Sequence, residues 1–393
     1  MDVKERAKRA LSKPAPFGPD IDVLHYIGEE VRQETPSSSV EELASRVGVE
    51  LRSPKASALY YQRDERIEIL KTLTSCVDIK PIESVDKDEL EYLWRLVPPD
   101  TDKYVASVAL YGKGGYFIRV RKGCRVELPI QTCFFMSGGA QLVHNVVVVE
   151  DGAEAIIVTG CTIMPESIGF HSSVTEIYLG RGSKLIDVTI HSWNRVTHVR
   201  PRTAAVLSEG ATYVSYYVNM SRTRTIQTLP RIELRGDGSQ CYSASIILGA
   251  EDSEYDIGSL ARLLGRETRA ELVSKVIARD RSRVVSRLKI EASGSRSKGF
   301  TECSALILSP SARVETIPEL DSASDDSELH HEASIGRIRD EEIEYLMLKG
   351  FDYREAVSIL IRGFVEVNLD FLPESVRKSM ESVLKVLAER SIV

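Results

Sequence analysis

The sequence predicts a mainly β protein whose core is a right-handed parallel β-helix, flanked by N-terminal and C-terminal helical regions. Two observations carry this prediction. Short alternating runs of apolar and polar residues begin at Tyr104, and a turn of small residues recurs among them at a nearly constant interval. Such a period is typical of architectures in which each repeat stacks on its neighbours.

The recurring turn has forms such as R-K-G-C-R-V and E-D-G-A-E-A. Its fourth position is occupied in turn by Cys124, Ala153, Ser183, Ala211, Ser239, Ser282 and Ala312. The successive intervals are 29, 30, 28, 28, 43 and 30 residues, so we expect one insertion, placed at Gly249–Glu267. A β-sandwich would instead rely on antiparallel hairpins with short turns and would show no such long period.

We divide the chain into a mostly helical region at 1–103, a β-helix core at 104–333 and a C-terminal helical region at 334–393. Ala58–Leu73 begins strand-like. Lys87–Val97 has apolar residues at helical spacing and is expected to form an amphipathic helix that stops at Pro98.

Three helices are expected after residue 333. The first has Ile343 on its apolar face and ends at Gly350. The second begins with a capping box of Asp352 and Glu355 and reaches Phe364. The third covers Glu374–Arg390, with an apolar face formed by Met380, Val383, Leu384 and Leu387.

The composition is that of an ordinary globular protein, with 42% hydrophobic residues, 28% charged residues and a net charge of −7. The N-terminal residues lack the apolar core of a signal peptide, and no run approaches the roughly 20 apolar residues that cross a bilayer, so we expect a cytoplasmic protein without a membrane contact. The mild acidity argues against a nucleic-acid partner. The six cysteines form no C-x-x-C motif and are expected to be free thiols.

One stretch combines possible metal ligands. Cys303 heads an apolar strand-like run, and an acidic loop then leads to His330, His331 and Glu332. A thiolate, an imidazole and a carboxylate can bind iron or zinc. The alternative from spacing alone is a buried cysteine at a strand start and a polar His-His-Glu at a helix entrance.

Several segments carry a family resemblance. T-E-C-S-A-L-I-L, L-H-H-E-A-S-I-G-R-I and Y-L-M-L-K-G lie near the C-terminus, with G-G-Y-F-I-R-V-R-K-G, G-C-T-I-M-P-E-S-I-G-F-H and V-T-I-H-S-W-N upstream. These segments, in order from about 104 to 373, resemble the SufB/SufD family, the scaffold subunits of the SUF iron–sulfur cluster assembly system. The resemblance implies the same β-helix fold.

The resemblance also implies roles for individual residues. Cys303 matches the cysteine at which a transient iron–sulfur cluster is built, and His331 and Glu332 match residues near it. Cys161 matches the cysteine that accepts sulfur as a persulfide. The sulfur path between the two cysteines is expected to include His191, Trp193 and Lys275.

Partners follow from the same resemblance. The helices from Tyr345 to Phe364 match the docking site of a SufC-type ABC ATPase. The chain has no Walker A motif, so ATP hydrolysis is expected of that partner and the chain is expected to be a scaffold without enzymatic activity. A sulfur donor protein and a second scaffold copy, in a homodimer or as a SufD-like paralogue, are also expected. Phe135 and Ser137 depart from the family pattern, and the resemblance leaves the involvement of a flavin open.

Two other functions are compatible with parts of the sequence. A SufD-like adaptor would stabilise the complex without receiving sulfur, and the presence of Cys161 argues against it. A β-helix enzyme acting on polysaccharide would need clustered carboxylates on one face of the solenoid. The acidic cluster of this chain, Asp321–Glu328, is instead expected in a loop.

Overall fold

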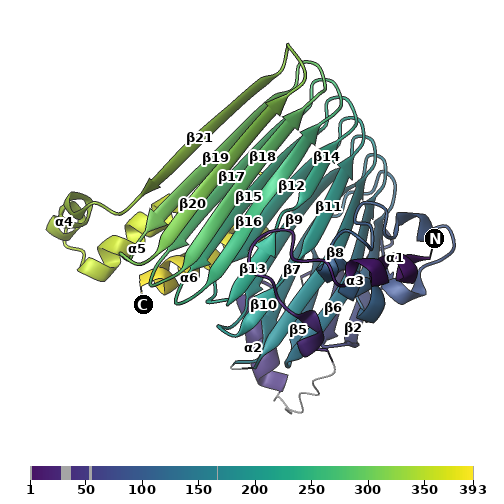
Figure 1. Ribbon diagram of the computed structural model, residues 1–393, viewed down its shortest axis with the longest axis horizontal. Coiled ribbons are helices and arrows are strands. Elements are labelled where there is room, and N and C mark those ends of the chain that lie inside the picture. The colour runs from purple at the N-terminus through teal and green to yellow at the C-terminus, as the bar shows by residue number, and fades with distance from the viewer. Residues whose placement is uncertain (1, 28–36, 53–54, 166, 393) are drawn as a thin grey trace.

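The computed structural model describes all residues except 1, 28–36, 53–54, 166 and 393. Its centre is a parallel β-solenoid of about eight turns, with helices towards both termini. Figure 1 shows the strands stacked side by side from the N-terminal end to β21, and α4, α5 and α6 beside the C-terminal end of the stack. The β-helix prediction is confirmed.

Two sheets form the walls of the solenoid. The first has the strand order β2-β1-β5-β7-β9-β12-β15-β17-β19-β21. Its strands are β1 Ala58–Arg63, β2 Arg66–Thr72, β5 Ile130–Met136, β7 Glu154–Ile163, β9 Lys184–Ser192, β12 Thr212–Asn219, β15 Gln240–Gly249, β17 Arg269–Ala278, β19 Lys298–Ile307 and β21 Glu328–Gly336.

The second sheet faces the first across the core. Its strands are β3 Val77–Pro81, β4 Tyr116–Val120, β6 Gly139–Val149, β8 Gly169–Leu179, β10 Thr197–Val199, β11 Arg202–Leu207, β13 Thr225–Thr228, β14 Arg231–Leu234, β16 Glu254–Leu263, β18 Arg283–Ala292 and β20 Arg313–Ser322. Alternate residues of each strand point inward, so every coil adds one layer to a continuous core.

The predicted insertion at Gly249–Glu267 is wrong. Ser239 is followed at the same corner by Thr268 and Ser297, since Gln240 pairs with Arg269 and Arg269 with Lys298. Ser282 belongs to the opposite corner, where Ser253 precedes it. The long interval arose because the turn motif occurs at both corners, and β16 is a regular strand within Gly249–Glu267.

The N-terminal part combines helices with strands. It contains α1 Val3–Ala10, α2 Ser37–Arg46, α3 Lys103–Tyr111 and the 3₁₀ turns Val23–His25, Ile82–Ser84 and Leu90–Tyr92, while β1 to β3 extend the two sheets. The amphipathic helix predicted over Lys87–Val97 is wrong. The buried Glu176 carboxylate accepts the backbone N–H groups of Trp94 and Leu96, both at 2.6 Å, and these bonds replace helical ones.

The prediction that all six cysteines are free is also wrong. Cys76 and Cys124 form a disulfide between residues 48 positions apart in the sequence. Cys76 comes just before β3 and Cys124 lies at the first corner of the solenoid, with their Cα atoms 5.7 Å apart. The spacing of the cysteines in the sequence does not predict this disulfide, because only the fold brings the two segments together.

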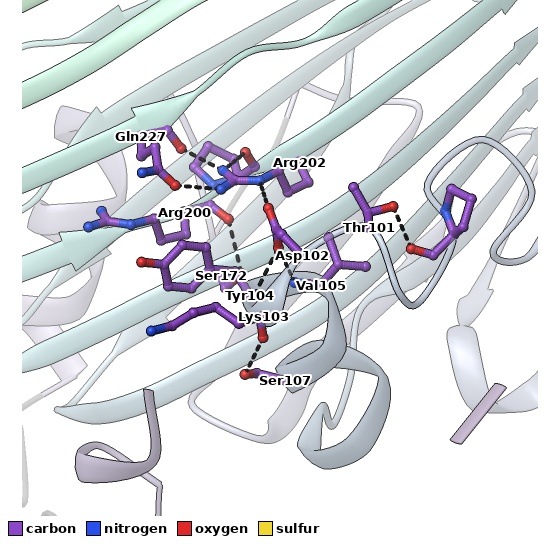
Figure 2. A network of polar contacts seen from close by, with 12 residues as sticks. Thr101, Asp102, Lys103, Tyr104, Val105, Ser107, Ser172, Arg200, Arg202 and Gln227 are labelled. Atoms are coloured by element: carbon purple, nitrogen blue, oxygen red, sulfur yellow. Dashed lines mark hydrogen bonds and ion pairs between the residues drawn. The ribbon is translucent and has the colours of Figure 1, made fainter. Parts of the chain in front are cut away.

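A polar network fixes α3 against the second sheet, as Figure 2 shows. The Asp102 carboxylate accepts the backbone N–H groups of Tyr104 and Val105 at 2.9 and 2.8 Å and so caps the helix. It also accepts from Nε of Arg202 at 2.6 Å, and both side chains are buried. This ion pair joins the N-terminal region to the solenoid.

The C-terminal helices are α4 Asp340–Leu348, α5 Tyr353–Phe364 and α6 Glu374–Ile392. The predicted capping box of Asp352 and Glu355 is present, and Met380, Val383, Leu384 and Leu387 are buried. These residues of α6 pack on the outer face of the first sheet. None of the described helices has the length and apolarity that a membrane crossing requires.

Replacing Asp102 should destabilise the protein strongly. Asp102→Ala removes the cap of α3 and leaves the buried guanidinium of Arg202 without its counter-charge, so we expect a loss of about 3–5 kcal/mol in the free energy of unfolding. Denaturant titration measures this loss. Glu65→Ala, which breaks an ion pair to Lys113 between exposed side chains, is the matched control and should cost less than about 1 kcal/mol. Equal losses would contradict the prediction.

Candidate functional site

Cys303 lies inside the solenoid near its C-terminal end. Its side chain is 0% exposed and belongs to the interior core, and its register neighbours are Ser274 on β17 and Ala333 on β21. Burial raises the pKa of the thiol to about 11, and a hydrogen bond with Ser286 opposes that shift. At neutral pH the thiol is therefore protonated.

His331 and Glu332 lie on β21, the neighbouring strand. His331 pairs in register with Thr301, and Glu332 pairs with Glu302. Since alternate residues of a strand face opposite sides, His331 is on the side of Cys303 and Glu332 is on the outer side. Both are exposed at the open end of the solenoid. Among the described residues, no three His, Cys, Asp or Glu side chains are grouped to hold a metal ion, so one copy of the chain does not assemble the predicted ligand set.

Cys161 lies on β7, deep in the same interior. It is 2% exposed, and His191 on β9 is its register neighbour. Nδ1 of His191 lies 3.0 Å from the Tyr217 hydroxyl, and the His191 ring contacts Trp193 with centroids 5.5 Å apart. Burial raises the pKa of Cys161 well above its ordinary value and lowers that of His191 well below. The structure thus brings together three of the predicted residues, Cys161, His191 and Trp193.

Cys161 lines a cavity of about 90 Å³ between the two sheets. The lining is rich in hydroxyl groups and includes Thr159, Thr189, Tyr213, Ser215, Tyr217, Ser243, Ser245 and Ser259. It also includes two imidazoles, of His171 and His191, and one carboxylate, of Asp187. A polar cavity inside a β-helix is unusual because the inward positions are normally apolar.

Four of these hydroxyl groups, those of Thr159, Thr189, Tyr217 and Ser245, belong to one column of the stack that ends at Cys303, which we call the hydroxyl column. Successive coils place Thr132, Thr159, Thr189, Tyr217, Ser245, Ser274 and Cys303 in register. Cys161 lies two residues beyond Thr159 on the same strand and face. The sequence analysis did not predict this column, although a Ser, Thr or Tyr recurs at the coil interval from Thr132 to Ser274.

Lys275 lies apart from these residues. It is next to Ser274 but faces outward, where its ammonium forms an ion pair with Glu302 and lies 5.7 Å from the centre of the Phe364 ring. Lys275 and Glu302 line a groove of about 1110 Å³ between the first sheet and the C-terminal helices. The structure therefore does not place Lys275 beside the cavity that His191 lines.

The C-terminal helices expose several large apolar side chains. Leu348 is 86% exposed and Tyr345 is 60% exposed, and Met347, Phe351 and Tyr353 are exposed beside them. Phe364, at the end of α5, is partly buried against the helix and sheet cluster. We call the five exposed residues the α4–α5 apolar surface.

The thiol of Cys303 should react slowly in the isolated chain. A pKa of about 11 instead of 9.0 leaves about 100-fold less thiolate at neutral pH. We expect alkylation of Cys303 by iodoacetamide, followed by peptide mass analysis at pH 7.5, to be at least about 100-fold slower than that of a model thiol. The same rate for Cys303 and the model thiol would show that the C-terminal end opens readily.

Comparison with known proteins shows which family the chain resembles. The family described as "SUF system FeS cluster assembly, SufBD core domain" matches residues 134–364. An Archaeoglobus fulgidus SufBD family protein is 34% identical over 90% of this chain and 96% of its own length. One from Methanothermobacter thermautotrophicus is 32% identical over 98% of both chains, and the SufB protein of Bacillus subtilis is 29% identical over 77% of this chain and 66% of its own. The chain belongs to the SufBD family of iron–sulfur cluster assembly proteins.

Proposed function

We propose that this protein is a scaffold on which a nascent iron–sulfur cluster is built, with sulfur received at Cys161 and the cluster held at Cys303. The observation that carries the proposal is the hydroxyl column, which links the cavity at Cys161 with Cys303. Five strand steps separate the two cysteines, roughly 24 Å at about 4.8 Å per step. The cavity follows the column as far as Ser245, and Ser274 and Cys303 are its next two members.

The cluster site would be completed by a second scaffold copy. Cys303 and His331 share one side of the open end, and one thiolate and one imidazole hold iron incompletely. Within the described residues, β21 pairs with β19 alone and β20 with β18 alone. Such free edges can pair with another strand. A homodimer or a SufD-like paralogue joined at this end would cover His331 and Glu332 and add ligands.

A SufC-type ATPase would dock on the α4–α5 apolar surface. A large exposed apolar patch usually marks a protein interface. The ion pair of Lys275 with Glu302, and the contact of Lys275 with Phe364, connect the end of α5 with the strand that carries Cys303. A shift of α5 on docking would therefore reach Cys303. Lys275 acts in this proposal as a link to the helices and not as part of the sulfur path.

Replacing Cys303 should abolish cluster formation. In anaerobic reconstitution with ferrous iron and sulfide, we expect the wild-type chain to gain visible charge-transfer absorption and Cys303→Ala not to gain it, because the thiolate ligand is lost. Cys133→Ala is the matched control, since Cys133 is buried on the outer side of the first sheet. A wild-type chain that takes up no cluster, even with its ATPase present, would instead favour the SufD-like adaptor.

Charge placed on the α4–α5 apolar surface should weaken ATPase binding. For Leu348→Asp we expect at least a 10-fold increase in Kd for a SufC-type ATPase, measured by calorimetry, because a hot-spot contact is worth about 2 kcal/mol or more. Leu264→Asp is the control, since Leu264 is 42% exposed and lies next to β16, outside this surface. Unchanged binding of Leu348→Asp would place the docking site elsewhere.

A further inference from the structure

The interior cavity holds a carboxylate that the proposed function does not use. Asp187 lies on β9 with its side chain half-buried in the cavity, and it accepts a hydrogen bond from the Tyr213 hydroxyl at 3.1 Å. It is the one acidic residue among those that line the cavity. The other titratable groups that face this space are Cys161 on β7, His191 on β9, His171 on β8, Tyr116 on β4, and Tyr213 and Tyr217 on β12.

Among these groups, Asp187 is the one best able to accept a proton near neutral pH. Burial raises its pKa to about 6, and the hydrogen bond from Tyr213 opposes the shift, so the carboxylate is ionised at pH 7. Burial lowers the pKa of His171 to about 3 and that of His191 well below its ordinary value, so both imidazoles are weak bases. Burial raises the pKa of Cys161, and the negative charge of Asp187, which lies four residues along β9 from the register neighbour of Cys161, adds to that rise.

A buried thiol that accepts sulfur must give up its proton, because the thiolate is the nucleophile. We propose that Asp187 is the proton acceptor for Cys161 when that residue takes up sulfur. This inference rests on the proposed role of Cys161 as the sulfur acceptor. It adds a residue that the family resemblance did not indicate.

The step balances without an added oxidant or reductant. Sγ of Cys161 attacks the outer sulfur of a donor persulfide, so a new S–S bond forms at Cys161 and the donor S–S bond breaks. The proton of Cys161 passes to the Asp187 carboxylate, and the departing donor thiolate takes a proton from solvent. When Cys161 releases the sulfur, the proton can return from Asp187.

The cavity offers a route for the proton. Thr159 and Thr189 line it between the two groups, and a volume of about 90 Å³ has room for about three water molecules. The proton transfer itself keeps the interior charge constant. One negative charge lies on Asp187 before the transfer and on the Cys161 thiolate after it, so the interior never holds two repelling anions.

The pH dependence of Cys161 modification tests the proposal. Methyl methanethiosulfonate is a small sulfur electrophile, and peptide mass analysis gives the rate at Cys161 alone. For the wild-type chain we expect the rate to rise with an inflection near pH 6, where Asp187 ionises. In Asp187→Asn the inflection should vanish and the rate at pH 7.5 should fall at least about 10-fold, because a general base is lost.

Two further variants keep the result interpretable. Tyr213→Phe removes the hydrogen bond that favours the charged carboxylate, so the inflection should move to higher pH even if Asp187→Asn does not fold. Glu271→Gln, on the outer face of the first sheet, should leave the profile of Cys161 unchanged. The proposal is wrong if Asp187→Asn keeps the wild-type profile, or if the wild-type profile has no inflection.

A cluster-assembly assay, combined with the pH profile of Cys161, separates this proposal from the proposed function. Cluster assembly from a persulfide donor that survives Cys161→Ser would overturn the role of Cys161 in sulfur uptake. The inflection in the pH profile of Cys161 modification would then still show whether Asp187 accepts the proton of the Cys161 thiol. Loss of assembly in Cys161→Ser together with an unchanged profile in Asp187→Asn would reject the base and keep the acceptor.

Discussion

Register pairing between successive coils is the constraint on which this structure depends. Each strand of the first sheet hydrogen-bonds to the strand one coil away, without a slip from β7 to β21. A slip of one residue would turn every inward side chain outward. Because the register holds, residues far apart in the sequence, such as Thr132 and Ser274, become members of one column.

The register pairing also reduces the free-energy cost of burying polar side chains in the interior. A buried hydroxyl group without a partner costs stability, and in a column the next coil supplies the partner. Thr132 donates to Thr159 at 2.8 Å, and Ser286 donates to Ser274 at 2.8 Å across the two sheets. The Trp193 indole N–H and the Thr301 hydroxyl are buried without a partner among the described residues. A polar species passing through the interior would find bonding groups at both positions.

The turn period predicted the solenoid, because stacking requires a repeat, and the spacing of apolar residues predicted the C-terminal helices, because each needs an apolar face. It failed where tertiary contacts override local preference, as at Lys87–Val97, where Glu176 captures backbone N–H groups. Family resemblance predicted roles for Cys161, His191, Trp193 and Cys303, and the structure groups the first three of them. The resemblance could not show that Lys275 and Glu332 face outward. Neighbouring residues of a strand face opposite sides, so the strand register decides the face of each side chain. Asp187 carries no motif, and its significance comes only from what surrounds it.

The regular coil also sets a scale. Each coil has 28 to 30 residues in the well-aligned part of the stack and adds one strand spacing along the solenoid axis. Losing or gaining a whole coil between β7 and β19 would preserve every column while changing the separation of Cys161 and Cys303 by about 4.8 Å. Along the solenoid axis, the distance between Cys161 and Cys303 can therefore change only in whole strand spacings.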